Sequence, residues 1–564
     1  MIARTPLYFG PEERSLFGWY HAPEGGPRGD LAVLVCPPIG HEYVNSHRSI
    51  RHLTDHIAEA GVPAMRFDYD GTGDSAGGDE DPGRVAAWLQ SIRVAMETLR
   101  ELSGCTRIVL AGARFGATLA ALTAAESEVA GLVLWTPVVR GRAYMRELKA
   151  LQLTGATRDS AELEPGGFLY TDETQRELGA VNLEEVAPKT PRALIIVRDD
   201  LIEETKLRDK WRATGIEVEQ VAAPGYNEMY APPHDTVVPS EAIAVTVRWV
   251  VRLNGGEARA ASVNVRTEQR VDGIRESLVR FGEGLFGIVS EPEQPTGPAI
   301  LLNNGGSTHH VGPNRLYVSI ARALSRAGFR VFRYDLPGLG DSVIADAARE
   351  NDSYLPETSA IIAAAMDALQ ADSFVCMGLC SGAHASFHAA RDVPKAAFVE
   401  SVLINPLTFY YKPGMSLNQS PAVHHEEWQR YLVSMRTMAG WSKLLRGNVR
   451  VSRILRTLYS RTRDIARGKL EALRKKKDHG DDLAADLRRI LELGRKMTFV
   501  FSRSDPGYDL LMINAGHVVK RFRKRGLVQL WRIDDANHTF EARSSRAVMI
   551  ETLTRHLATR YLSA

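Results

Sequence analysis

The stretch that decides the fold of this chain is Gly378-Leu379-Cys380-Ser381-Gly382. A short apolar run precedes it, and a run of small residues that is typical of a helix follows it. The pattern predicts a strand, a tight turn and a helix, with a glycine two residues before and two residues after the central cysteine. Such a turn holds its central residue in a crowded backbone conformation, and the glycines let strand and helix approach closely. The sequence therefore presents Cys380 as a candidate nucleophile at the start of a helix.

An internal repeat indicates that the chain contains two copies of the same fold. Residues 66–75, RFDYDGTGDS, recur as residues 333–342, RYDLPGLGDS, at an offset of 267. The short run 16–18, LFG, recurs at 285–287 with an offset of 269. Residues 112–116, GARFG, align at an offset of 266 with residues 378–382, the turn that we call the elbow. Offsets that agree this closely over a long span predict two homologous domains in tandem. We place them at residues 1–256 and 257–564, joined by a glycine-containing linker.

Each copy alternates short apolar runs with longer amphipathic stretches, the pattern of a mainly parallel sheet covered by helices. The strands predicted in the first copy are 31–36, 64–67, 107–111, 131–135, 193–197 and 217–222. Those predicted in the second copy are 299–303, 330–334, 374–377, 401–404, 498–501 and 527–531. The fold class is therefore α/β, with one such sheet in each domain.

The second copy carries an insertion after its elbow. Asp200 and Asp505 are 305 residues apart, and His234 and His538 are 304 apart, so the second copy holds about 38 more residues than the first between its elbow and its acid. The extra segment, about 406–496, is predicted to be helical and includes a strongly basic run. We expect it to form a helical cap over the carboxyl ends of the strands.

Taken with these motifs, both halves resemble α/β-hydrolases of the serine-aminopeptidase-like kind, over nearly the whole chain. The first half is similar to a subgroup with arginine in place of the nucleophile, often found beside polysaccharide or natural-product genes. The elbow around Cys380 also resembles those of polyhydroxyalkanoate synthases and dienelactone hydrolases, which use a Cys-His-Asp set. The resemblance implies two tandem α/β-hydrolase domains, the first catalytically degenerate and the second active.

The candidate catalytic set lies in the second half. A thiol is a strong nucleophile when a neighbouring base generates the thiolate, and a helix N-terminus also favours the anion. His538 follows the last predicted strand, where the resemblance implies the histidine, and Asp505 follows the strand 498–501. The order nucleophile, acid, histidine is that of the fold. Asp509 is the alternative acid.

An oxyanion hole requires two backbone N–H groups directed at the tetrahedral oxygen. The residue after the nucleophile, Ser381, supplies one. The loop after the strand 299–303 supplies the other; we favour Gly306, with Gly305 or Ser307 as alternatives.

The first copy has Arg114 where the second has Cys380. A guanidinium group stays protonated and does not act as a nucleophile, so this copy is predicted to lack acyl-enzyme chemistry. Two interpretations stay open. In one, Arg114 pairs with Asp200 or another buried acid and the domain is a scaffold; in the other, Arg114 and the loop 37–42 bind a carboxylate or phosphate.

Composition sets the broad class. A chain of 564 residues with 44% hydrophobic and 24% charged residues is an ordinary globular protein of more than one domain. A net charge of +2 argues against nucleic-acid binding, and no transmembrane run or signal peptide is evident. Four cysteines without metal-ligand spacing fit a reducing cytoplasm. We expect no metal and no cofactor, because no phosphate-binding or nicotinamide motif stands out.

The function predicted from these features is cysteine-dependent acyl transfer. The expected substrate is an acyl thioester, which Cys380 attacks before the acyl group passes to an amine, an alcohol or another acceptor. The basic cap favours an acidic donor, either an acyl carrier protein or coenzyme A, in specialised natural-product metabolism. Alternatives are a thioesterase or esterase that uses water, and a scaffold without enzymatic activity.

Overall fold

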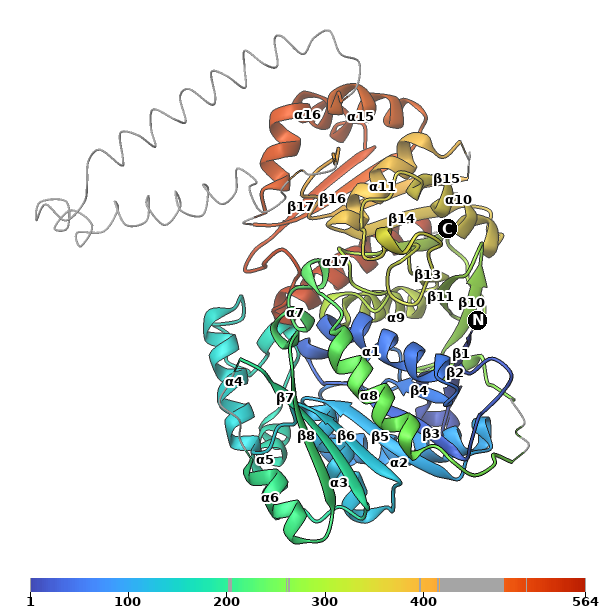
Figure 1. Ribbon diagram of the computed structural model, residues 1–564. Coiled ribbons are helices and arrows are strands. Elements are labelled where there is room, and N and C mark those ends of the chain that lie inside the picture. Colours follow the sequence, from blue (N-terminus) through green and yellow to red (C-terminus); the bar gives the residue numbers. More distant parts are fainter. Residues whose placement is uncertain are drawn as a thin grey trace, which may run out of the picture.

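The structure is a computed structural model that describes residues 2–200, 205–259, 261, 264–394, 397–412, 415, 481–503 and 505–562. Figure 1 shows two lobes stacked on each other, the first copy in blue to green and the second in yellow-green to red. Most of the segment predicted as a cap, 406–496, lies outside the described residues.

The first lobe is built on one sheet with the strand order β1-β2-β4-β3-β5-β6-β7-β8 among the described residues. Pairing is parallel from β4 to β8 and antiparallel for β1 and β2. The central strands are apolar on both faces because helices cover both, and every residue of β3 is buried. The strands are β1 (Ala3–Phe9), β2 (Leu16–Ala22), β3 (Leu31–Cys36), β4 (Ala64–Phe67), β5 (Arg107–Ala113), β6 (Gly131–Trp135), β7 (Arg192–Arg198) and β8 (Glu217–Ala223).

Helices enclose this sheet in two layers (Figure 1). Helices α1 and α8 pack together on one face, whereas α2 and α3 cover the other. The helices are α1 (His41–Glu59), α2 (Arg84–Ser103), α3 (Phe115–Glu126), α4 (Gly141–Thr154), α5 (Asp172–Ala180), α6 (Lys206–Ala213), α7 (Tyr226–Met229) and α8 (Ser240–Leu253).

The second lobe repeats the plan with the strand order β17-β16-β15-β14-β12-β13-β11-β10-β9. Its strands are β9 (Glu268–Val271), β10 (Ile274–Phe281), β11 (Leu285–Glu291), β12 (Ala299–Asn303), β13 (Val331–Tyr334), β14 (Phe374–Leu379), β15 (Phe398–Ile404), β16 (Lys496–Ser502) and β17 (Val528–Ile533). Helices α9 (Leu316–Arg326) and α17 (Arg543–Tyr561) cover one face. The other face carries α10 (Thr358–Leu369), α11 (Ser381–Asp392), α15 (Leu483–Glu492) and α16 (Gly507–Arg523).

The predicted fold class is confirmed: the chain contains two α/β-hydrolase-fold domains in tandem. Each of the twelve predicted strands is present, with ends that differ by no more than a few residues. The antiparallel strands at the start of each copy, β1 and β2 and then β9 to β11, were not predicted. Among the described residues, no helix combines the length and the apolar character needed to span a membrane.

The two lobes meet through an apolar contact between equivalent positions. Phe17 and Phe286, which the repeat relates to each other, stack with ring centroids 6.2 Å apart. Trp19 packs edge-on against Phe286 at 4.7 Å, and Tyr8 and Ile288 complete a small buried cluster. Because repeated residues face each other, the interface has the self-complementary character of a two-fold dimer interface.

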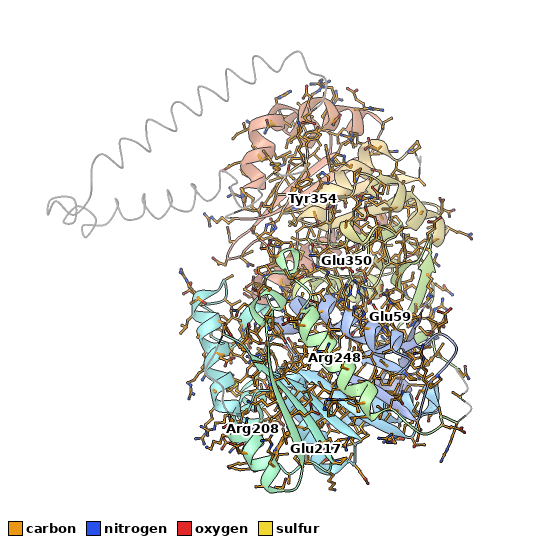
Figure 2. The ribbon with its side chains drawn as sticks, viewed as in Figure 1. Glu59, Arg208, Glu217, Arg248, Glu350 and Tyr354 are labelled. Atoms are coloured by element: carbon orange, nitrogen blue, oxygen red, sulfur yellow. The ribbon has the colours of Figure 1, made fainter. Side chains whose placement is uncertain are left out.

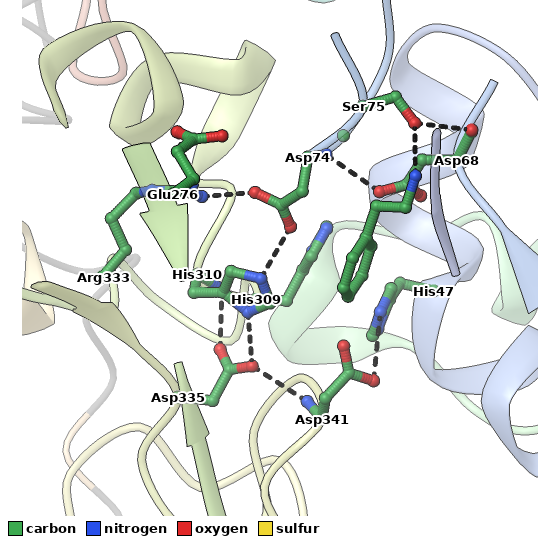
Figure 3. A network of polar contacts seen from close by, with 12 residues as sticks. His47, Asp68, Asp74, Ser75, Glu276, His309, His310, Arg333, Asp335 and Asp341 are labelled. Carbon is green, nitrogen blue, oxygen red and sulfur yellow. Dashed lines mark hydrogen bonds and ion pairs between the residues drawn. The ribbon is translucent and has the colours of Figure 1, made fainter. Parts of the chain in front are cut away.

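Charged groups reinforce this symmetry (Figure 3). Arg66 of the first copy forms an ion pair with Asp341 of the second, and Arg333 of the second forms one with Asp74 of the first. Both pairs are buried, and both arginines and both aspartates belong to the repeated stretch 66–75 and 333–342. The motif that revealed the duplication is therefore also the contact that joins the two copies.

His310 lies at the centre of this network (Figure 3). Its Nδ1 is 2.7 Å from Asp335 Oδ2, and its Nε2 is 2.7 Å from Asp74 Oδ2 across the interface. Burial opposes a charge on the ring, but the two carboxylates outweigh this effect and raise the pKa of His310 to about 10. The histidine is therefore an imidazolium that links two domains through two carboxylates.

The raised pKa of His310 predicts a pH dependence of stability. In the unfolded chain the ring titrates near its ordinary value of 6.5. The stabilisation is therefore fully present below about pH 6.5 and is lost as the pH rises through about 10, by an amount on the order of a few kcal/mol. We expect the melting temperature to fall between pH 7 and pH 10 more steeply in the wild type than in His310→Gln. Parallel slopes in the two proteins would contradict this assignment.

Candidate active site

The predicted elbow lies between β14 and α11. Cys380 has φ 58° and ψ −115°, a conformation that L-residues rarely adopt, and its N–H donates to the carbonyl of Ile404 at 3.0 Å. The flanking glycines are needed because a Cβ at Gly378 would overlap the backbone of Gly382, and a Cβ at Gly382 would overlap the carbonyl of Asn303. Cys380 is partly exposed, whereas Cys376, four residues earlier in β14, is fully buried.

The predicted histidine and acid contact each other. His538 Nδ1 lies 2.7 Å from Asp505 Oδ2, and the Asp505 side chain is fully buried. The N–H of Gly507 donates to Asp505 Oδ1 at 2.9 Å, which fixes the carboxylate. Asp509, the alternative acid, is an exposed residue of α16. The structure thus brings Asp505, rather than Asp509, to the imidazole.

Asn405 connects the two loops that carry these groups, and sequence reasoning missed it. Its Nδ2 donates to the carbonyl of His538 at 2.8 Å, and its Oδ1 accepts from the N–H of Ser502 at 2.8 Å. It follows β15 with a positive φ of 44°. An asparagine directly after a predicted strand was the signal available, because asparagine tolerates this conformation better than most residues do.

The electrostatics of the site favour a charged imidazole. Burial opposes the charge on His538, but the neighbouring Cys380 and Asp505 outweigh it and raise its pKa to about 10. The Nε2 atom of His538 lies on the far side of the ring from Asp505. It is buried and has no hydrogen-bond partner among the described residues. The contribution of Cys380 to the raised pKa of His538 places the sulfur within interaction range of the ring.

The predicted oxyanion loop lies beside the elbow. The N–H of Gly306 donates to the hydroxyl oxygen of Ser381 at 2.8 Å, and this hydroxyl in turn donates to the carbonyl of Asn304 at 3.3 Å. The Ser381 side chain thus accepts the hydrogen bond that a substrate oxygen would accept from Gly306. Tyr317 supports the turn, because its hydroxyl accepts from the N–H of Leu379 at 2.9 Å.

Aromatic side chains surround Cys380 in the second lobe. Tyr354, labelled in Figure 2, stacks on Tyr411 with ring centroids 4.1 Å apart and packs edge-on against His384. Burial lowers the pKa of His384 to about 3, so the ring is neutral, and its Nε2 is buried without a partner among the described residues. Burial, with a contribution from Cys380, raises the pKa of Tyr354. Tyr354 therefore lies near Cys380, and its ring connects the elbow to Tyr411 and His384.

The equivalent elbow of the first lobe holds Arg114 in almost the same conformation, with φ 52° and ψ −125°. Its guanidinium pairs with Glu42 at 2.6 Å and with Glu147, and it lies over the rings of Tyr144 and Tyr226. The predicted partner Asp200 instead pairs with Arg198, and His234 is exposed beside Asp235. Two carboxylates already balance the charge of Arg114, which favours the scaffold interpretation over anion binding.

The first lobe also contacts the helix that follows His538. Glu164, a buried residue of the first copy, accepts at 2.9 Å from the N–H of Arg543, the first residue of α17. Arg546, one turn further, donates to the carbonyl of Gly167 at 3.1 Å. A carboxylate at a helix N-terminus satisfies a free N–H and complements the helix dipole. The loop that carries His538 therefore ends at a helix that the other domain caps.

One group of side chains has the spacing of a cation site. His310, Asp335 and Asp341 each offer a ligand atom within 4.8 Å of the others. Arg66 already pairs with Asp341, and His310 bridges Asp335 and Asp74, so these charges are balanced within the protein. We assign the group to domain association rather than to metal binding.

Two family models match the chain, one in each half. Residues 36–182 match a model described as serine aminopeptidase, S33, and residues 298–461 match one described as alpha/beta hydrolase fold. The two matches agree with the tandem arrangement of the sheets. No curated protein sequence matches the chain.

Solved structures similar to the chain each correspond to less than half of it. Est1E from Butyrivibrio proteoclasticus with bound ferulic acid is 18% identical, covers 44% of this chain and 96% of its own, and has a TM-score of 0.33. Proline iminopeptidase from Mycobacterium smegmatis is 14% identical, with coverages of 44% and 98% and a TM-score of 0.32. A Pyrococcus furiosus esterase is 15% identical, with coverages of 45% and 92% and a TM-score of 0.33.

The contact between His538 and Asp505 predicts which acid supports Cys380. Asp505→Asn removes the charge that orients and stabilises the imidazolium, so alkylation of Cys380 by iodoacetamide at pH 7 is expected to slow by roughly tenfold or more. Asp509→Asn, the same change on the neighbouring exposed acid, should leave the rate within about twofold. Intact-mass spectrometry over time measures both rates. An equal loss in the two variants would contradict the assignment.

Proposed function

We propose that this chain is an enzyme that transfers acyl groups from an acyl thioester through a thioester bond to Cys380. The observation that carries the proposal is the conjunction of Cys380 on a strained elbow with a partly exposed imidazole that Asp505 holds and whose pKa is raised by the neighbouring sulfur. A serine would form a more stable oxygen ester, whereas exchange between two thioesters is nearly balanced in free energy. A cysteine nucleophile therefore suits an acyl group that must be passed on.

The first half-reaction transfers the acyl group to the enzyme. The thiolate of Cys380 attacks the thioester carbonyl, and the N–H groups of Ser381 and Gly306 stabilise the resulting oxyanion. For this, the Ser381 hydroxyl must give up the hydrogen bond that it accepts from Gly306. The tetrahedral intermediate collapses with cleavage of the substrate C–S bond, and the imidazolium of His538 protonates the departing thiolate. The acyl-enzyme and a free thiol are formed.

The second half-reaction uses the same groups in reverse order. Neutral His538 takes the proton from an incoming amine, alcohol or other acceptor as it attacks the Cys380 thioester. Collapse of the second intermediate releases the acylated acceptor and regenerates the thiolate beside the imidazolium. The proposed donor is a carrier protein or coenzyme A recognised by the basic run between residues 443 and 477, which lies outside the described residues.

Water is the second candidate acceptor. The hydrolase fold of both domains and the two matched family models favour a thioesterase or esterase in which water attacks the acyl-enzyme. The two functions share every step up to the acyl-enzyme. The fate of the loaded protein therefore distinguishes them.

The first domain is assigned a positioning role. Its Arg114 elbow is internally neutralised, and its Glu164 caps α17, which begins five residues after His538. The first domain, which has no nucleophile at its elbow, thereby helps to position His538 of the second domain.

Loading of Cys380 tests the reaction. Incubation with a panel of acyl thioesters should give a mass increase equal to one acyl group in the wild type and none in Cys380→Ala, as measured by intact-mass spectrometry. Adding amines or alcohols to the loaded, isolated protein should release acylated acceptor faster than free acid. Release of free acid alone would identify a hydrolase instead. The absence of any adduct, with equal turnover in Cys380→Ala, would contradict acyl-enzyme chemistry and support a scaffold.

Removal of the helix cap tests the role of the first domain. Glu164→Ala leaves the N–H of Arg543 without an acceptor, and because a cap contributes about 1 kcal/mol we expect kcat to fall by roughly fivefold to tenfold with little change in KM. Glu164→Gln should restore part of the activity, because its amide oxygen still accepts. Glu162→Ala is the matched control, since that exposed residue lies 3.6 Å from the Arg543 side chain and does not cap the helix. Equal kcat in Glu164→Ala and wild type would contradict the role.

A further inference from the structure

A large cavity lies between the two domains, away from Cys380. Its volume is about 840 Å³, which is in the range of cavities that hold small organic molecules. The first domain contributes the loop 71–80, the segment 168–170 and Trp88, and the second contributes one side each of α9 and α17. None of Cys380, His538 and Asp505 lines it.

The cavity wall is mainly apolar, with charged groups that are mostly paired. Trp88, Phe168, Val318 and Ile550 are among its apolar residues. Its ion pairs are Arg84 with Asp70, Arg322 with Glu276, Arg326 with Asp272, Arg555 with Glu551, and Glu80 with Arg543. Once these pairs are set aside, three charged lining residues form no ion pair among the described residues: Arg315, Arg546 and Asp79.

The two unpaired arginines bind only carbonyl oxygens. Arg315 donates to the carbonyls of residues 71, 73, 75 and 77 in the first domain. The buried Arg546 donates from Nη1 alone, to the carbonyls of Gly167 and Asn314, and its Nε and Nη2 make no hydrogen bond within the described residues. Asp79 accepts from the N–H of Leu169 at 3.2 Å and offsets one of the two positive charges. Among the lining residues, the unpaired charges therefore sum to one positive charge, and Arg546 keeps free guanidinium donors. The carboxylate of Glu164, outside the lining, also lies within electrostatic range of Arg546.

Because the two domains are repeats, the surroundings of Arg315 can be compared with those of the equivalent residue in the first domain. Arg315 is equivalent to Arg48, 267 residues earlier. Arg48 pairs with the carboxylate of Glu350 at 2.9 Å, and Arg51 and His52 pair with the same carboxylate. Figure 2 places Glu350 at the boundary between the lobes. Beside Arg48, the interface is filled by the carboxylate of Glu350. Beside Arg315, the equivalent space is the cavity.

We propose that this cavity binds an organic carboxylate with an apolar body. The carboxylate pairs with Arg546 beside Arg315, as Glu350 pairs with Arg48, and the apolar body packs against Trp88, Phe168 and Ile550. An excess of one positive charge matches a monoanion better than a phosphate dianion. The inference does not rest on the chemistry proposed for Cys380, and it assigns the interdomain cavity a ligand of its own.

The cavity is also connected to the catalytic loop. Its wall on α17 includes Arg546 and Ile550, and this helix starts five residues after His538. Asn314, another lining residue, donates to the carbonyl of Thr539 at 3.3 Å. A bound carboxylate therefore contacts the helix and the loop that hold the imidazole.

Calorimetric titration of full-length Cys380→Ala with sodium decanoate tests the proposal, and the absence of the thiol prevents any covalent reaction. We expect one molecule to bind per chain. Because a hydrogen bond to a charged group contributes about 1.5–3 kcal/mol, Arg546→Leu should weaken binding by roughly tenfold or more. Arg521→Leu, the same change at an exposed arginine of α16 that does not line the cavity, should alter affinity by no more than about twofold. Ile550→Trp, which adds bulk where the apolar body is proposed to pack and leaves the charges unchanged, should weaken binding by roughly tenfold or more.

Four results would overturn the assignment. They are the absence of decanoate binding, equal affinity in Arg546→Leu and its parent, binding of 1-decanol as tight as that of decanoate, and binding of decyl phosphate more than about tenfold tighter than that of decanoate. If Arg546→Leu does not fold, Ile550→Trp decides the location, because undiminished binding in that variant places decanoate elsewhere.

Discussion

The structure depends on an exchange of charged side chains between two equivalent turns. Arg66 reaches Asp341 in one direction and Arg333 reaches Asp74 in the other, and His310 joins Asp74 to Asp335 between them. Buried charges are costly unless each is paired, so these groups tolerate little displacement of one domain relative to the other. The stacked rings of Phe17 and Phe286 add apolar contact at the same place. Two copies of one fold are thus held in a defined orientation.

That orientation brings Glu164 of the first copy into contact with the helix that follows His538 in the second. The elbow of the first copy keeps the strained geometry at Arg114, but the guanidinium is neutralised by Glu42 and Glu147. Its Glu164 instead caps the helix that follows His538, and the cavity beside that helix is shared by both domains. Glu164 therefore contacts the helix after His538, and His538 contacts Asp505 near the strained elbow at Cys380. These contacts connect the domain interface to the proposed nucleophile.

Much of this could be predicted from the sequence, for physical reasons. Glycines around Cys380 are required by the close approach of β14 and α11, and the parallel strands are short, mainly apolar runs, so the elbow and the twelve parallel strands were recognisable. The antiparallel strands β1, β2 and β9 to β11 were missed because polar residues or a glycine interrupt their apolar runs. Asn405 and Glu164 act through contacts between residues 133 and 379 positions apart, which no local pattern records. The repeated stretch indicated the duplication. Its ion pairs across the interface could not be predicted, because they join residues of different domains.

The central claim is that the sulfur of Cys380 acts on the imidazole of His538, which Asp505 holds in place. The most direct measurement is the titration of the His538 ring by nitrogen-15 NMR, with the resonance assigned by comparison with His538→Gln. The account predicts an imidazolium in the wild type at pH 8, with a pKa of about 10, and a shift of the titration to lower pH in Cys380→Ala. A ring that is neutral at pH 8, or that titrates identically with and without the sulfur, would contradict it.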